Sequence, residues 1–215
     1  MRAAADDSPD PSAEPPLTPP GAKKSSVLRT VLKLYPVGAF LWVAVIIFFA
    51  QPRAPWLGLG AFVVAAGEGL RFWAAGYEAR RGREPPAAKQ DAFPTAGPYG
   101  WVRNPDHIGN VAIVAGLTFW AGGLLPWLPL AAAAFFVWQY SLAQRARDQH
   151  FGRRGDWEYR AYRGTVPIWL PRFAPRPLGC GGRWRVGVAL AREVPVFVII
   201  VVVAAAAVLL PPLLG

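Results

Sequence analysis

The sequence has one cysteine, Cys180, and two histidines, His107 and His150. A single cysteine excludes an intramolecular disulfide framework and a multi-cysteine metal site. Two histidines are too few for a histidine-rich metal centre. We therefore expect no metal ion and interpret Cys180 as a free structural thiol.

The first 26 residues lack an apolar run and are rich in proline, alanine and acidic residues. This composition predicts a disordered N-terminal tail over residues 1–26 instead of a secretory signal peptide. We expect the first transmembrane helix to act as the insertion signal.

Charged residues are absent from long parts of a chain that is 53% hydrophobic. The last such run extends from Val194 to Gly215 without a charge. A run of this length crosses the ~30 Å hydrocarbon layer as a helix, in which the backbone satisfies its own hydrogen bonds. The sequence thus predicts an all-α integral membrane protein with about five transmembrane helices, at about 34–50, 56–77, 107–124, 127–142 and 194–214. The short GGLLPW sequence between the third and fourth segments predicts an antiparallel hairpin.

Basic residues alternate between the loops of this predicted arrangement. The N-terminal stretch and the second loop are basic, and eleven arginines lie between Arg145 and Arg192. The first loop carries only Arg53, and the hairpin turn has no basic residue. The positive-inside rule then predicts a multi-pass protein of the cytoplasmic (inner) membrane, with a cytoplasmic N-terminus and an external C-terminus. The net charge of +10 follows from this topology, so we expect no nucleic-acid partner.

Two charged residues interrupt the second apolar segment. Glu68 and Arg71 are three residues apart, so they share one helix face and can pair. Charges inside a membrane span more often face a polar cavity than lipid. The pair therefore either holds helices together or contributes to a substrate site.

A polar stretch at 90–110 precedes the third segment. Gly97 and Pro98 predict a turn, after which Asn104 and Pro105 occupy the cap and first-turn positions of a helix. Such a helix start, next to Arg103, can bind a carboxylate. His107 and Gly109 follow in the same helix, where the glycine permits close approach. The plainer alternative is a capped helix with an arginine that extends to the membrane surface.

A second polar stretch, at 146–172, follows the fourth segment. Its aromatic residues Trp157, Tyr159 and Tyr162 alternate with charged residues. A helix lying on the membrane surface would show the same pattern. Because both stretches are cytoplasmic and flank the same hairpin, we expect them to meet at one membrane face.

Three sequence segments resemble the isoprenylcysteine carboxyl methyltransferase and phospholipid methyltransferase superfamily. They are GEGLRFWAAG, GPYGWVRNPDHIGN and the run from Asp148 through GDWEYRAYRGTVPIWLP. The resemblance covers Gly67 to Arg172, about half of the chain. It implies a membrane-embedded methyltransferase that uses S-adenosylmethionine, with a cytosolic cofactor site and a lipid-like substrate that enters from the bilayer.

The resemblance also implies roles for individual residues. The family's acidic position falls on Asp148 in an ungapped alignment, or on Gln144 in an alternative one. Asp148 would bind the ammonium or ribose of the cofactor, Arg103 its carboxylate, and His107 would orient the substrate or accept a proton. The expected catalytic residues are thus Arg103, His107 and Asp148. Those expected at the cofactor are Tyr99, Arg103, Asn104, Pro105, Gly109, Asp148, Tyr159 and Tyr162, and those at the substrate are Glu68 and Arg71.

Two other functions remain open on the sequence. Asn104, His107 and Asp148 depart from the family pattern, which is compatible with a catalytically inactive lipid-binding or scaffold protein of the same fold. A small transporter would carry charges along several helices, whereas here only the second segment does. The expected division is a methyltransferase-like domain at 27–180, followed at 181–215 by an amphipathic lead-in and a C-terminal transmembrane helix. The expected partner is a membrane lipid or lipophilic small molecule that offers a carboxylate or an amine.

Overall fold

The structure is a computed structural model that describes residues 26–77, 95–153, 157–175 and 183–211. Within these ranges all regular secondary structure is helical, and no strand is present. The predicted all-α class is therefore confirmed for the described residues. The elements are α1 (Ser26–Phe48), α2 (Ala54–Ala75), η1 (Gly97–Gly100), α3 (Pro105–Ala121), α4 (Trp127–Arg153), α5 (Trp157–Thr165) and α6 (Val186–Leu209).

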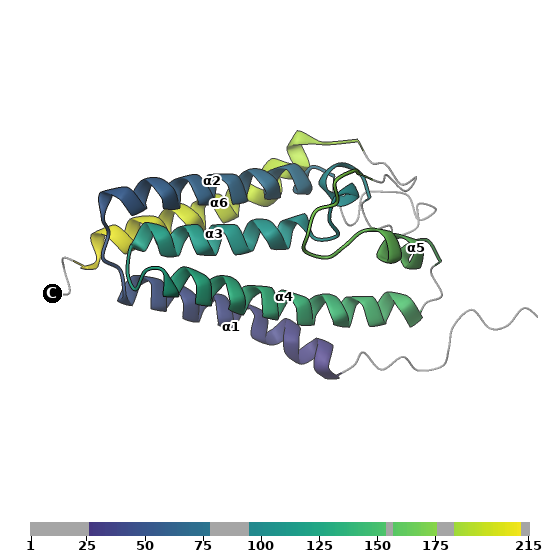
Figure 1. Cartoon of the computed structure of the whole chain (residues 1–215), viewed down its shortest axis with the longest axis horizontal. Helices are drawn as coiled ribbons and strands as arrows, with labels where there is room; N and C mark the ends of the chain where they lie inside the picture. The colour runs from purple at the N-terminus through teal and green to yellow at the C-terminus, as the bar shows by residue number, and fades with distance from the viewer. Residues whose placement is uncertain (1–25, 78–94, 154–156, 176–182, 212–215) are drawn as a thin grey trace, which may run out of the picture.

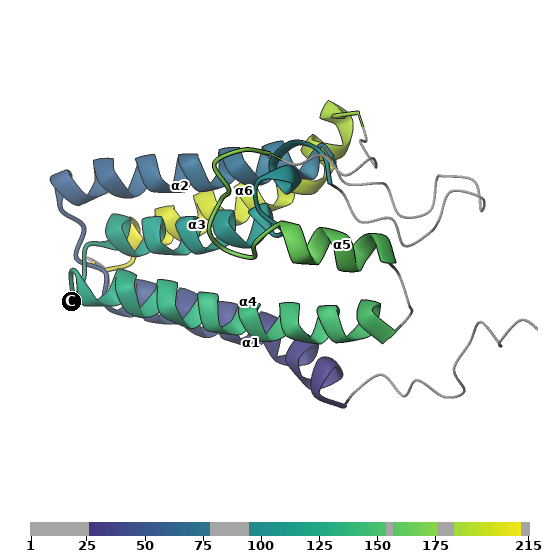
Figure 2. The ribbon, with the colours of Figure 1, turned by 45° about the vertical axis from the view of Figure 1, so that its right-hand side comes forward.

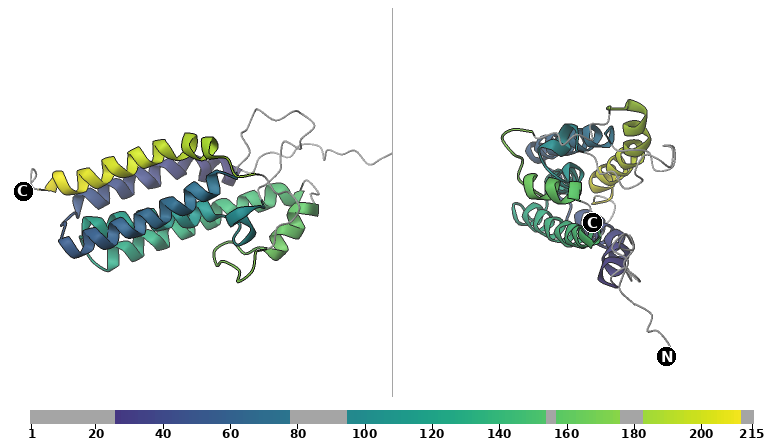
Figure 3. Two further views of the ribbon diagram at one scale, coloured as in Figure 1. Left: turned by 90° about the horizontal axis from the view of Figure 1, so that it is seen from above. Right: turned by 90° about the vertical axis from the view of Figure 1, so that its right-hand side faces the viewer.

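The long helices α1, α2, α3, α4 and α6 lie side by side along the long axis of the molecule (Figure 1). Successive long helices run in opposite directions, so α3 and α4 form the predicted antiparallel hairpin. The short helices η1 and α5 gather at the end where α2 stops and α3 starts (Figure 2). We call this end the η1–α5 end. The view from above shows the same grouping (Figure 3).

Among the residues that the structure describes, two helices are long and apolar enough to cross a membrane. They are α2, with 22 residues and a mean hydropathy of 1.2, and α6, with 24 residues and a mean hydropathy of 2.4. The described apolar part of α1, Val37–Phe48, is shorter, and α3 has 17 residues. Large apolar side chains also point outward, including Phe40 at 76% and Phe62 at 72% exposure. These features are consistent with a membrane protein, because soluble monomers rarely expose extended apolar surface.

The backbones of α2 and α3 approach each other closely through two pairs of glycines. A Cβ atom on Gly60 would lie 2.7 Å from the Gly116 carbonyl oxygen, and one on Gly67 would lie 2.7 Å from that of Gly109. Both glycines of each helix are seven residues apart. Small residues at such positions let transmembrane helices pack backbone to backbone. This spacing fixes the register of α2 against α3.

The last helix, α6, belongs to the same core as the first helices. The buried cluster combines Ile46 of α1, Leu117 of α3 and Val203 of α6. The Trp120 indole N–H of α3 also donates to the Ala204 carbonyl of α6 over 3.0 Å. At the end of α3, next to Trp120, the Gln51 N–H donates to the Ala121 carbonyl over 2.7 Å, which joins the α1–α2 connection to α3.

Replacing Gly60 by alanine should destabilise the protein, because its Cβ would lie 2.5 Å from the Trp120 backbone nitrogen. Overpacking of this kind costs about 1–3 kcal/mol. Gly58 lies on the same helix with no atom within 4 Å of its added Cβ. Gly58→Ala should therefore be neutral or stabilising by up to about 1 kcal/mol through helix propensity. Thermal unfolding in detergent compares the two variants, and equal melting temperatures would contradict the packing described here.

Candidate functional site

The two polar stretches meet at the η1–α5 end, as predicted. The Tyr162 hydroxyl of α5 donates to the Tyr99 carbonyl of η1 over 2.9 Å. Both tyrosines are buried. The Arg103 N–H donates to the Pro167 carbonyl over 2.8 Å. The two stretches are therefore held together by the Tyr162–Tyr99 hydrogen bond and by the Arg103–Pro167 hydrogen bond.

Arg103 and Asp148 form a further contact between the two stretches. The Nη1 atom of Arg103 lies 3.4 Å from both carboxylate oxygens of Asp148, and each side chain is less than one-tenth exposed. Gln144, one turn earlier on α4, donates from Nε2 to Asp148 Oδ1 over 2.7 Å. Arg163 of α5 approaches the same carboxylate at 3.5 Å. The two alternative positions for the family's acidic residue thus share one helix face and one cluster.

Two buried donors at this corner have no hydrogen-bond partner among the described residues. They are Nε of Arg103 and Nδ2 of Asn104. Asn104 is the N-cap of α3 and Pro105 follows in its first turn, as predicted, but the Asn104 side chain makes no cap hydrogen bond. Buried polar groups without partners are costly. The two N–H groups are therefore available as donors to a ligand that binds next to Arg103.

His107 lies in an aromatic environment in the first turn of α3. Its ring stacks on Tyr140 of α4, with centroids 4.4 Å apart and planes 13° apart. The Trp169 ring centroid lies 6.5 Å away. Tyr140 and Trp169 were not predicted as site residues. A signal for Tyr140 exists in the sequence, because polar Gln139 and Ser141 flank it inside the fourth apolar segment.

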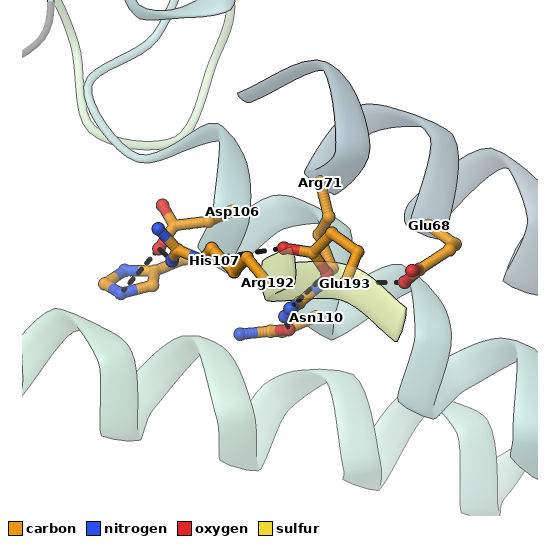
Figure 4. Close-up of polar contacts among 7 residues, drawn as sticks. All are labelled: Glu68, Arg71, Asp106, His107, Asn110, Arg192 and Glu193. Atoms are coloured by element: carbon orange, nitrogen blue, oxygen red, sulfur yellow. Dashed lines mark hydrogen bonds and ion pairs between the residues drawn. The ribbon is translucent and has the colours of Figure 1, made fainter. Parts of the chain in front are cut away.

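Arg71 pairs mainly with a residue that the sequence analysis did not assign. It donates from Nε over 3.0 Å and from Nη2 over 2.6 Å to one carboxylate oxygen of Glu193 on α6. Its Nη1 atom donates to the side-chain oxygen of Asn110 (Figure 4). Glu68 is more distant, at 3.6 Å from Arg71 Nε. The guanidinium of Arg71 thus joins α2 to α3 and α6, and its expected contact with a substrate stays a prediction.

The charged cluster extends from Glu193 toward the start of α3. Arg192 approaches Glu193 at 3.5 Å and Asp106 at 3.9 Å. Asp106 in turn lies 3.9 Å from Nε2 of His107. Figure 4 shows these residues joining α2, α3 and α6. We call the set Glu68, Arg71, Asp106, Arg192 and Glu193 the charged cluster.

Three other residues predicted at the site are Gly109, Pro105 and Tyr159. An added Cβ on Gly109 would lie 2.5 Å from Cγ of Arg71, so this glycine permits the close approach of Arg71, and its expected role at the cofactor stays a prediction. Pro105 is buried in the first turn of α3. Tyr159 lies in α5, and its side chain is outside the described residues.

The Arg103–Asp148 corner suits an α-amino acid group. Such a group carries a carboxylate, which Arg103 can bind as a fork of donors, and an ammonium, which Asp148 can bind. Nδ2 of Asn104, the residue next to Arg103 in the chain, is a further buried donor without a partner among the described residues. S-Adenosylmethionine contains this amino acid group, so the residues present fit it. No group of three or more metal-ligating side chains occurs within the described ranges.

Arg71→Met should destabilise the protein strongly, because it leaves the buried Glu193 carboxylate without its partner. Breaking a buried ion pair costs about 3–5 kcal/mol. The double variant Arg71→Met/Glu193→Gln should lose less stability than Arg71→Met alone, since no orphan charge remains. Glu68→Gln, on the same face of α2, should have a smaller effect than Glu193→Gln. Thermal unfolding in detergent measures all four, and strictly additive losses would refute the pairing.

Comparison with known proteins gives no relative for this geometry. Neither a scan of protein-family models nor searches of curated proteins and solved structures find a match. The functional interpretation of this site therefore depends on the residues of the site and on the sequence resemblance.

Proposed function

We propose that this chain is a membrane-embedded S-adenosylmethionine-dependent methyltransferase that acts on a lipid or prenyl-derived acceptor. One observation carries the proposal. The Arg103–Asp148 pair lies where the two motif stretches meet, beside two buried donors without partners. This arrangement can hold the carboxylate and the ammonium of an amino acid group at the same time.

The cofactor, when bound, would supply a methyl group on a sulfonium, which is open to in-line displacement by a nucleophile. Arg103 and Asp148 would orient the amino acid end, and positioning of this kind accounts for a large share of catalysis. Tyr140, Trp169 and His107 form an aromatic wall that would exclude water from an acceptor. For an amine acceptor His107 would take the proton at an imidazole nitrogen, and Asp106 would stabilise the resulting charge. A carboxylate acceptor needs no base.

In the proposed topology, α1, α2, α3, α4 and α6 each cross the membrane, and the η1–α5 end faces the cytoplasm. The charge distribution supports this orientation. Arg103 follows η1, Arg163 lies in α5 and Arg185 directly precedes α6, whereas Arg53 lies in the connection between α1 and α2. The positive-inside rule places the more basic end in the cytoplasm.

A catalytically inactive lipid-binding or scaffold protein is the second candidate. The observation in its favour is that Arg103 and Asp148 already contact each other, and Gln144 donates to the same carboxylate. An ion pair with a purely structural role would show the same contacts. Binding of the cofactor separates the two functions.

S-Adenosylmethionine should bind the full-length protein in detergent, and Arg103→Ala and Asp148→Ala should each weaken binding. Losing one charged hydrogen bond costs about 1.5–3 kcal/mol, which corresponds to roughly 10- to 150-fold in affinity. Arg145→Ala is the matched control, because Arg145 is exposed on α4 next to Gln144. Isothermal titration calorimetry measures the affinities.

Absence of binding by the wild-type protein would favour the scaffold function. Loss of binding in Gln144→Ala together with retention in Asp148→Ala would assign the family's acidic position to Gln144. An equal loss in Arg145→Ala would show that the effect is not specific to this corner.

Reporter fusions test the topology. Fusions after Gly215 and near Gly122 should both report an external location, since α6 and α3 end at the face opposite the η1–α5 end. A fusion in the loop between α2 and η1 should report a cytoplasmic location. A cytoplasmic signal at Gly215 or Gly122 would defeat the five-span arrangement.

A further inference from the structure

A cavity of about 420 Å³ lies between α2, α3 and α6. Its described lining is apolar except for Glu68, and its largest side chains are Trp120 and Phe197. We call it the α2–α6 groove. None of the residues in the Arg103–Asp148 corner lines it.

Small side chains create this groove. Ala61 and Ala65 of α2 face Ala204 of α6 across it. The hydrogen bond from the Trp120 indole to the Ala204 carbonyl joins two of the lining residues and fixes α3 against α6 beside the groove. Ala61 and Glu68 are seven residues apart, and a helix rises by 1.5 Å per residue, so the groove extends roughly 10 Å along α2. This shape suits a segment of one hydrocarbon chain.

A carboxylate closes the polar end of the groove. The Oε2 atom of Glu68 is buried and accepts no hydrogen bond within the described part of the chain. Its nearest cation, Arg71 Nε, lies 3.6 Å away and donates to Glu193 over 3.0 Å. The charged cluster combines three carboxylates with two guanidinium groups (Figure 4). Among the described residues, Glu68 has one ion pair in this cluster, whereas Glu193 and Asp106 each have two, so the least paired carboxylate is the one that the groove reaches.

We propose that the α2–α6 groove binds a single-chain lipid amine. The hydrocarbon chain lies along Val64, Phe197 and Val201, and the ammonium donates to Glu68. The apolar lining selects a hydrocarbon chain, because burying it stabilises the complex in proportion to its area. The buried Glu68 oxygen without a hydrogen bond selects an ammonium over a neutral or anionic head, because a carboxylate forms its stronger hydrogen bonds with a charged donor. This site is separate from methyl transfer and does not depend on it.

Photolabelling of the full-length protein in phosphatidylcholine nanodiscs tests the site. The probes are a long-chain primary amine with a diazirine in its chain and the matching long-chain alcohol. Mass spectrometry should map the amine to residues 61–68 and 197–204, and unlabelled dodecylamine should compete. Glu68→Gln should weaken amine labelling about 10- to 150-fold, as expected for loss of a charged hydrogen bond. It should leave labelling by the alcohol unchanged.

A matched pair of alanines tests the groove without touching the charged cluster. Ala65 lines the groove and Ala66 does not, and both are exposed positions of α2. Ala65→Phe should abolish amine labelling of residues 197–204, whereas Ala66→Phe should label as the wild type does. Equal labelling in these two variants would overturn the groove as the site. Equal labelling by amine and alcohol, unaffected by Glu68→Gln, would overturn the choice of an amine.

Discussion

The guanidinium of Arg71 is the constraint on which the helix bundle depends. A cation inside an apolar bundle needs opposite charge and hydrogen-bond acceptors, because its burial alone would be very costly. Glu193 supplies the charge from α6, and Asn110 supplies an acceptor from α3. The helices α2, α3 and α6 must therefore come together around the Arg71 guanidinium. The position of α6, and with it the α2–α6 groove, follows from this requirement.

The glycines of α2 and α3 make that meeting possible. Gly109 lacks the Cβ atom that would collide with the stem of Arg71. The Gly60–Gly116 and Gly67–Gly109 contacts set the register of the two helices. This register determines where the first turn of α3 emerges, and so where Arg103 lies relative to α4. Backbone packing in the apolar part of the protein is in this way linked to the geometry of the polar corner.

Local sequence signals predicted much of the fold, but not its long-range pairs. Hydrophobic runs located all five long helices, and Asn104 and Pro105 marked the start of α3. The fourth helix was predicted to end near Leu142, yet α4 continues to Arg153, because alanine, glutamine and arginine favour helix and no proline follows. Its extension carries Asp148 toward Arg103. The Arg71–Glu193 pair spans 122 positions, and no periodicity or spacing in the chain links residues so far apart.

The two polar centres of the protein differ in the sign of their charge. At the η1–α5 corner, Arg103 and Arg163 both approach the single carboxylate of Asp148. In the charged cluster, Glu68, Asp106 and Glu193 share Arg71 and Arg192. The first centre therefore favours a ligand that carries a carboxylate, and the second favours a cation. The first turn of α3 lies between them, since Arg103 and Asp106 are three residues apart. The start of α3 therefore contributes a residue to each centre, although the two centres favour groups of opposite charge.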